Sequence, residues 1–137
     1  MVILRDVYEA PRTASVDILY QLLKERPPAA NISHRAMPTW DEHKRFVASR
    51  PYDAWYLIAY PDEVVGAVYL TPADEIGVFV FKKFQGRGHA RQAIEALMKA
   101  HPRERYLANI APGNDPSLNL FKKLGFIHIQ ETYEIHK

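Results

Sequence analysis

Gln85-Gly86-Arg87-Gly88-His89-Ala90 joins an apolar run, residues 76–81, to a helical pattern over residues 91–101. This order predicts a strand, a glycine-rich turn and a helix. Backbone N–H groups converge at the N-terminus of such a helix, where the helix dipole is positive, and together they hold a phosphate. Gly86 and Gly88 have no Cβ, so an anion can approach the backbone closely. The stretch therefore predicts a phosphate-binding turn.

The spacing of this turn excludes two common phosphate loops. It is not G-x-x-x-x-G-K-[ST], and no third glycine completes G-x-G-x-x-G. The remaining pattern, Q-x-x-G-x-A, resembles the acyl-CoA signature Q/R-x-x-G-x-G/A of the GNAT family of N-acetyltransferases. A plain strand-to-helix turn is the alternative for this motif taken alone. The resemblance implies that the pyrophosphate of coenzyme A is held by Gln85, Gly86, Arg87, Gly88, His89, Ala90 and Arg91.

A second motif downstream supports the same resemblance. Residues 106–110 predict a short buried strand, and residues 116–124 predict a helix that Asp115 caps and Gly125 ends. The run N-x4-N-x2-S-x3-F-x2-L-G-F is similar to the second half of the family's cofactor site. It implies cofactor contacts from Asn109, Asn114, Ser117 and Phe121. The polar members could equally satisfy their own backbone at a helix start.

Length and composition predict one domain over residues 1–137, since 47% hydrophobic residues suffice for a single core. The resemblance covers nearly all of the chain and implies an α+β fold. Its mostly antiparallel twisted sheet would have helices on both faces and one parallel strand pair splayed at the cofactor site. The predicted order is βααβββαβαβ: strand 3–8, helices 15–26 and 39–49, strands 54–60, 64–70 and 75–81, helix 91–101, strand 106–110, helix 116–124 and strand 126–135.

Several classes of protein are disfavoured by composition. The absence of cysteine excludes disulfides and thiolate metal sites, and the 6 histidines show no metal-ligand spacing, so no metal is expected. No apolar run approaches the ~20 residues of a membrane span. Residues 1–6 lack the basic and apolar regions of a secretory signal. We therefore expect a cytoplasmic protein without a membrane partner.

Charge is unevenly distributed although the net charge is only +2. Residues 1–81 hold 8 Lys/Arg and 11 Asp/Glu, a net charge of −3, whereas residues 82–105 hold 7 and 2, a net charge of +5. The basic block suits the phosphates of coenzyme A, although Lys99, Arg103 and Arg105 fit a solvated helix face. The acidic part favours a cationic acceptor if it gathers at the cleft, and it disfavours nucleic acid.

The resemblance implies transfer of an acetyl group from acetyl-CoA to a primary amine of a small molecule or peptide, within a ternary complex. The backbone of Val78, Phe79 and Val80 would pair with the pantetheine arm and polarise the thioester. Glu75, at the start of the same strand, is the candidate general base. Its alternative is a solvent-facing charge at a strand start.

The general acid and the acceptor site are less defined. Many family members have a tyrosine where this chain has Phe121. Water, Tyr133 or Tyr106 could then protonate the thiolate, or it could leave unprotonated; Tyr133 is the residue we select. His34 and Trp40 are the candidate substrate residues, and Trp40 also fits a core position.

Two other functions stay open, and so does the oligomeric state. A non-catalytic acyl-CoA-binding module would retain the cofactor motif without turnover. A nucleic-acid binder would use the basic block, but no stacking platform accompanies that block. The open edge of the terminal strand offers a surface for a homodimer.

Overall fold

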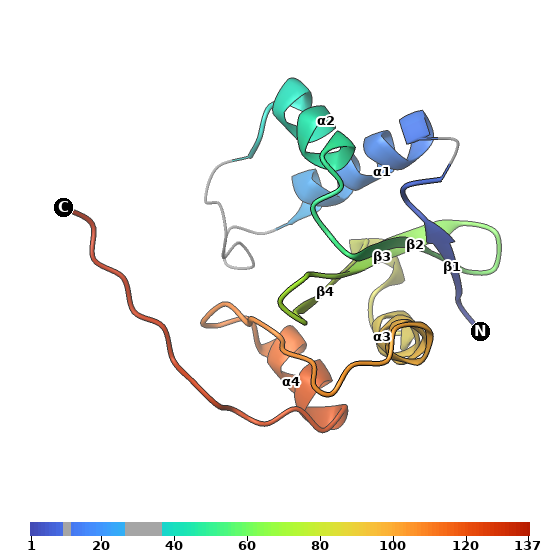
Figure 1. The fold of residues 1–137 in the computed structure, drawn as a ribbon. Helices are drawn as coiled ribbons and strands as arrows, with labels where there is room; N and C mark the ends of the chain where they lie inside the picture. The colour runs from blue at the N-terminus through green and yellow to red at the C-terminus, as the bar shows by residue number, and fades with distance from the viewer. Residues whose placement is uncertain (10–11, 27–36) are drawn as a thin grey trace.

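The computed structural model describes residues 1–9, 12–26 and 37–137. Its sheet is antiparallel, with neighbours in the order β1-β2-β3-β4. Helices α1 and α2 cover one face of the sheet, and α3 and α4 lie on the opposite side (Figure 1). The predicted α+β architecture is confirmed. The strands are β1 (Ile3–Asp6), β2 (Ala54–Ala59), β3 (Val64–Leu70) and β4 (Ile76–Val80); the helices are α1 (Arg12–Glu25), α2 (Trp40–Ala48), α3 (His89–Ala100) and α4 (Asp115–Lys123).

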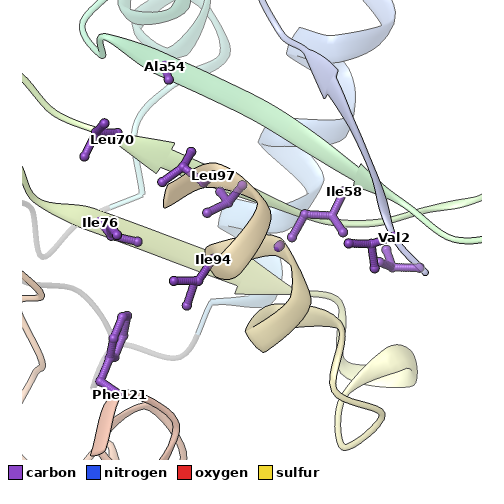
Figure 2. Close-up of a cluster of buried hydrophobic side chains, with 11 residues drawn as sticks. Val2, Ala54, Ile58, Leu70, Ile76, Ile94, Leu97 and Phe121 are labelled. Carbon is purple, nitrogen blue, oxygen red and sulfur yellow. The ribbon is translucent and has the colours of Figure 1, made fainter. Parts of the chain in front are cut away.

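A hydrophobic cluster lies on each face of the sheet because side chains alternate along each strand. On one face, Ile94 and Leu97 of α3 are fully buried against the strands, as Figure 2 shows. On the other face, Leu19 and Leu22 of α1 pack with Val47 of α2 against the sheet. The two clusters fix the strands between two helix layers, so the end of β4 and the turn after it have a defined position.

A capping box is present at the start of α2, with Thr39 as the N-cap. The Thr39 hydroxyl accepts from the Glu42 amide at 3.2 Å, and the Glu42 carboxylate accepts from the Thr39 amide at 2.8 Å. One turn later, the buried His43 contacts α1, where its Nε2 lies 2.9 Å from the Val16 carbonyl oxygen. Since a carbonyl oxygen only accepts, Nε2 carries the proton in this contact.

Lowering the pH is expected to destabilise the packing of α1 on α2 through His43. Burial lowers the pKa of His43 below its ordinary value, so the unfolded chain takes up a proton at a higher pH than the folded chain. The contribution of His43 is complete above pH ~6.5 and is lost as the pH falls below it, with a slope of at most ~1.4 kcal/mol per pH unit. Urea unfolding of the wild type and His43→Gln between pH 8 and pH 5 measures this slope. Equal slopes in the two proteins would contradict the prediction.

The structure differs from the sequence prediction in its last two strands. Residues 106–110 make only one parallel bridge, between Leu107 and Glu75, because they run beside the sheet for a single residue pair. Residues 126–135 form no strand and lead away from the fold (Figure 1). A strand needs a hydrogen-bonding neighbour, and the apolar side chains of this segment are instead exposed, namely Ile127, Ile129, Tyr133 and Ile135.

Candidate functional site

The glycine-rich turn has the backbone conformation that the sequence predicts. Gly86 and Gly88 have φ angles of 79° and 81°, in the left-handed region that favours glycine. Gly88 is the N-cap of α3, and its carbonyl accepts the first helical bond from the Gln92 amide at 3.2 Å. The helix therefore begins at His89, two residues earlier than predicted, because the second glycine already turns the chain into it.

Unpaired backbone donors gather at this turn. Within the described residues, the amides of Gly86 to Arg91 have no hydrogen-bond acceptor, as expected before and in the first turn of a helix. A Cβ at Gly86 or Gly88 would meet no atom within 4 Å, so the space beside the backbone is open. Converging N–H groups, a helix N-terminus and open space together fit a phosphate.

The side chains of the motif take different positions. The Gln85 amide group donates to the Val80 carbonyl at 2.9 Å and so ties the turn to β4. Arg87 is exposed, and Arg91 lies 3.4 Å from Glu95 in a half-exposed ion pair. His89 is buried against Tyr60, so only its backbone faces the open side of the turn. The two arginines remain available to an anion from solvent.

The edge of β4 opens directly before the turn. The Ile76 amide donates to the Leu107 carbonyl at 2.8 Å, and the Leu107 amide donates to Asp74 at 2.8 Å. Backbone groups alternate between the two edges of a strand, so those of Val78 and Val80 also point outward, past the single bridge. The backbone of Phe79 points toward β3 instead. Val78 and Val80 are therefore the members of the predicted trio whose backbone faces the open edge.

Glu75 lies at the point where the two chain segments diverge, and its carboxylate is held in place. One oxygen accepts from the Thr71 hydroxyl at 3.2 Å, and the other accepts from the Asn109 side-chain amide at 2.6 Å. The structure thus brings together two residues that the sequence analysis placed in separate roles. Asn109 contacts the candidate base directly, and Thr71 was missed because nothing in its turn sequence identifies a carboxylate partner.

Two predicted cofactor residues of the α4 region, Asn114 and Phe121, make contacts within the protein. The Asn114 side chain caps the helix by accepting from the Ser117 amide at 3.3 Å. Phe121 is only 3% exposed and packs edge to face on Phe126, at a ring distance of 5.0 Å. Its ring faces the core (Figure 2), so we no longer expect the ring to contact a cofactor.

The predicted general acid does not reach the site. Tyr133 is 86% exposed, and its hydroxyl donates to Glu131 at 2.9 Å, in the terminal segment that leaves the fold. The strand that was expected to carry Tyr133 does not form, so this placement does not favour Tyr133 as the general acid. The hydroxyl of Tyr106 contacts the carbonyls of Met98 and His101 and accepts from the Arg103 amide, so it caps the end of α3.

The two predicted substrate residues gain no support as such. Trp40 packs edge to face on Tyr20, with ring centres 5.2 Å apart, and lies close to His43. These contacts make Trp40 part of the packing between α1 and α2. His34 lies outside the described residues. No group of His, Asp or Glu among the described residues is arranged to hold a metal ion. Across the same residues, no helix is long and apolar enough to cross a membrane.

Comparison with solved structures shows the same fold in other proteins. A domain from Methanocaldococcus jannaschii superimposes with a TM-score of 0.81 at 20% identity, over 98% of this chain and 93% of that one. An acetyltransferase from Thermus thermophilus gives 0.72 at 20% identity, over 96% and 90%. The spermidine N-acetyltransferase from Vibrio cholerae, solved with CoA and spermine, gives 0.74 at 17% identity, over 94% and 82%.

Sequence comparison gives the family. No curated protein matches the chain. The family model described as the acetyltransferase (GNAT) family matches residues 16–126, which span most of the fold and include the glycine-rich turn, β4 and α4. The resemblance seen in the two sequence motifs therefore extends through the whole site, and the chain belongs to the GNAT family of acetyltransferases.

Proposed function

We propose that this protein transfers an acetyl group from acetyl-CoA to a primary amine in a ternary complex. The observation that carries the proposal is the set of unpaired amides at the glycine-rich turn, next to the open edge of β4. Family membership supports acetyl transfer, and the Vibrio cholerae relative solved with CoA supports the choice of co-substrate. The amides of Gly86 to Arg91 would hold the pyrophosphate, with Arg87 and Arg91 adding positive charge.

The chemistry needs a polarised thioester and a proton acceptor. The outward N–H of Val78 or Val80 would donate to the thioester oxygen and stabilise the negative charge that develops on it. The amine nitrogen forms a bond to the acetyl carbon, the carbon–sulfur bond breaks, and coenzyme A leaves as a thiolate. Glu75 would take the proton of the amine, directly or through one water.

Departure of the thiolate does not require an acid near the sulfur. A thiol has a pKa of ~8.5, so its thiolate is a tolerable leaving group near neutral pH. Phe121 has no hydroxyl, Tyr106 caps α3, and Tyr133 leaves the fold. We therefore propose that the thiolate leaves unprotonated or takes its proton from water.

Calorimetric titration with acetyl-CoA, followed by assay of free thiol with a panel of amines, tests the proposal. Binding together with amine-dependent thiol release supports acetyl transfer. Binding without release for every amine would favour the acyl-CoA-binding module instead. Absence of binding would overturn the proposal.

Homodimer formation stays a prediction, and its basis has changed. The terminal strand whose edge was expected to pair is absent, but residues 126–135 still present an alternating row of exposed apolar side chains. Light scattering on the full chain and on a chain ending at Gly125 would show whether this segment joins two copies.

A further inference from the structure

The face of β4 that looks toward α1 and α2 carries an unusual aromatic surface. Gly77 is essential to it, because a Cβ there would lie only 2.1 Å from the ring of Tyr69. The Tyr69 ring therefore crosses the neighbouring strand at this glycine. Tyr52 stacks on Tyr69 with ring centres 4.0 Å apart and an angle of 4°. The two rings lie face to face, and we call this stack the platform.

A cation lies at the end of this platform. The guanidinium carbon of Arg26 is 3.8 Å from the centre of the Phe79 ring, at the end of α1. The preceding residue fixes this end of the helix, because the Glu25 carboxylate accepts from the Lys82 amide at 2.8 Å. The residue after α1 thus places its guanidinium over Phe79, near the end of β4.

The electrostatics of the platform suit an anion. Burial lowers the pKa of Arg26, with the nearby Tyr69 and Tyr52 opposing the shift, so the guanidinium is partly removed from water but stays charged at neutral pH. Burial also raises the pKa of Tyr52 and Tyr69, which keeps both hydroxyls protonated. A desolvated guanidinium near neutral hydroxyl groups binds a carboxylate strongly.

The platform lies on the same side of β4 as the candidate base. Side chains alternate along a strand, so one face carries positions 75, 77 and 79. Glu75 is close enough to raise the pKa of Tyr69. One strip of the strand therefore has a carboxylate at its start and a guanidinium near its end. The open backbone edge at Val78 lies between them.

Two acidic residues near this strand are paired with a cation. Arg103 contacts Asp74 at 2.6 Å and Asp53 at 2.9 Å. These two carboxylates are therefore neutralised within the protein, whereas Glu75 is held by the uncharged Thr71 and Asn109.

We propose that Arg26, with the Tyr52–Tyr69 platform, binds a carboxylate of the acceptor, so that the acceptor is an amine that also carries a carboxylate. This inference rests on the proposed acetyltransferase function and assigns its substrate class. The amine would lie toward the outward backbone of Val78, within reach of Glu75 directly or through water. An amino acid has the two groups that this strip would recognise.

A matched panel of free amino acids and their amides tests the proposal, because each pair differs only in the carboxylate. We expect the wild type to acetylate one or more free acids with a higher kcat/KM than the matching amide. Arg26→Met should lower that acid-to-amide ratio by about tenfold to a hundredfold, the equivalent of one charge-assisted contact. Lys24→Met, on the same helix, removes a charge from above Tyr20 and should leave the ratio unchanged.

Calorimetry with acetyl-CoA distinguishes failure of the carboxylate subsite from failure of the proposed acetyltransferase function. If the wild type binds acetyl-CoA and acetylates amides or a polyamine in preference to the free acids, the carboxylate subsite is overturned while the proposed function stands. An unchanged ratio in Arg26→Met also overturns it. If the wild type does not bind acetyl-CoA, the proposed function itself fails, and the inference that rests on it falls too.

Discussion

Gly88→Glu is expected to weaken acetyl-CoA binding at least ~100-fold, measured by calorimetric titration. The new side chain would project into the open space beside the turn, where we expect the pyrophosphate. Its carboxylate would repel the phosphates and block the amides that hold them. Loss of two charge-assisted hydrogen bonds, at ~1.5–3 kcal/mol each, already corresponds to more than a hundredfold in affinity.

Gly125→Glu is the matched control for this variant. Gly125 also has a positive φ, 97°, and a Cβ there would likewise meet no atom within 4 Å. The control therefore introduces the same charge and a similar backbone strain at the end of α4, away from the turn. Equal loss of binding in both variants would point to a general effect on folding. Unchanged binding in Gly88→Glu would remove the turn from the cofactor site.

Glu75→Gln is expected to lower kcat by about 10²- to 10⁴-fold and to leave acetyl-CoA affinity unchanged. Glutamine keeps the shape of the side chain and one acceptor oxygen, so it retains one of the two contacts with Thr71 and Asn109. It cannot accept the proton of the amine. Thiol release measured at saturating acetyl-CoA, as a function of pH, gives the rate and also shows whether a titrating base has been lost.

Glu63→Gln serves as the control, because Glu63 is an exposed carboxylate in the turn between β2 and β3. It should retain the wild-type rate and pH profile. Full activity in Glu75→Gln would show that Glu75 is a structural partner of Asn109 rather than the base. Acetyl-CoA binding without transfer, in the wild type and in Glu75→Gln alike, would favour the non-catalytic module.

Features with a local physical cause were predictable from the sequence. The turn at Gly86 and Gly88 depends on backbone freedom and helix-start chemistry, which a short stretch of sequence contains. The capping box at Thr39 is local in the same way. The three strands between residues 54 and 80 were also predicted well, because each is short, apolar and bounded by turn residues.

Features that depend on distant partners were not predictable. The segments 106–110 and 126–135 have strand-like composition, but strand formation requires a neighbour along the whole segment. Among the described residues, segment 106–110 makes one bridge and segment 126–135 makes none. The direction of the Phe121 ring depends on how α4 sits on the core. The position of the Arg26 guanidinium could not be predicted, because it depends on contact with Phe79, which is far away in the sequence.

The fit of Tyr69 over Gly77 has a consequence for how this protein can change during evolution. Three atoms of the Tyr69 side chain, two ring carbons and the hydroxyl oxygen, lie within 2.4 Å of where any Cβ at position 77 would stand. Position 77 can therefore not gain a side chain alone: a larger residue there requires a smaller or differently oriented one at 69. Among relatives that keep the tyrosine at position 69, we expect a glycine at 77, and lineages that lose the glycine should also lose the tyrosine and, with it, their preference for acceptor.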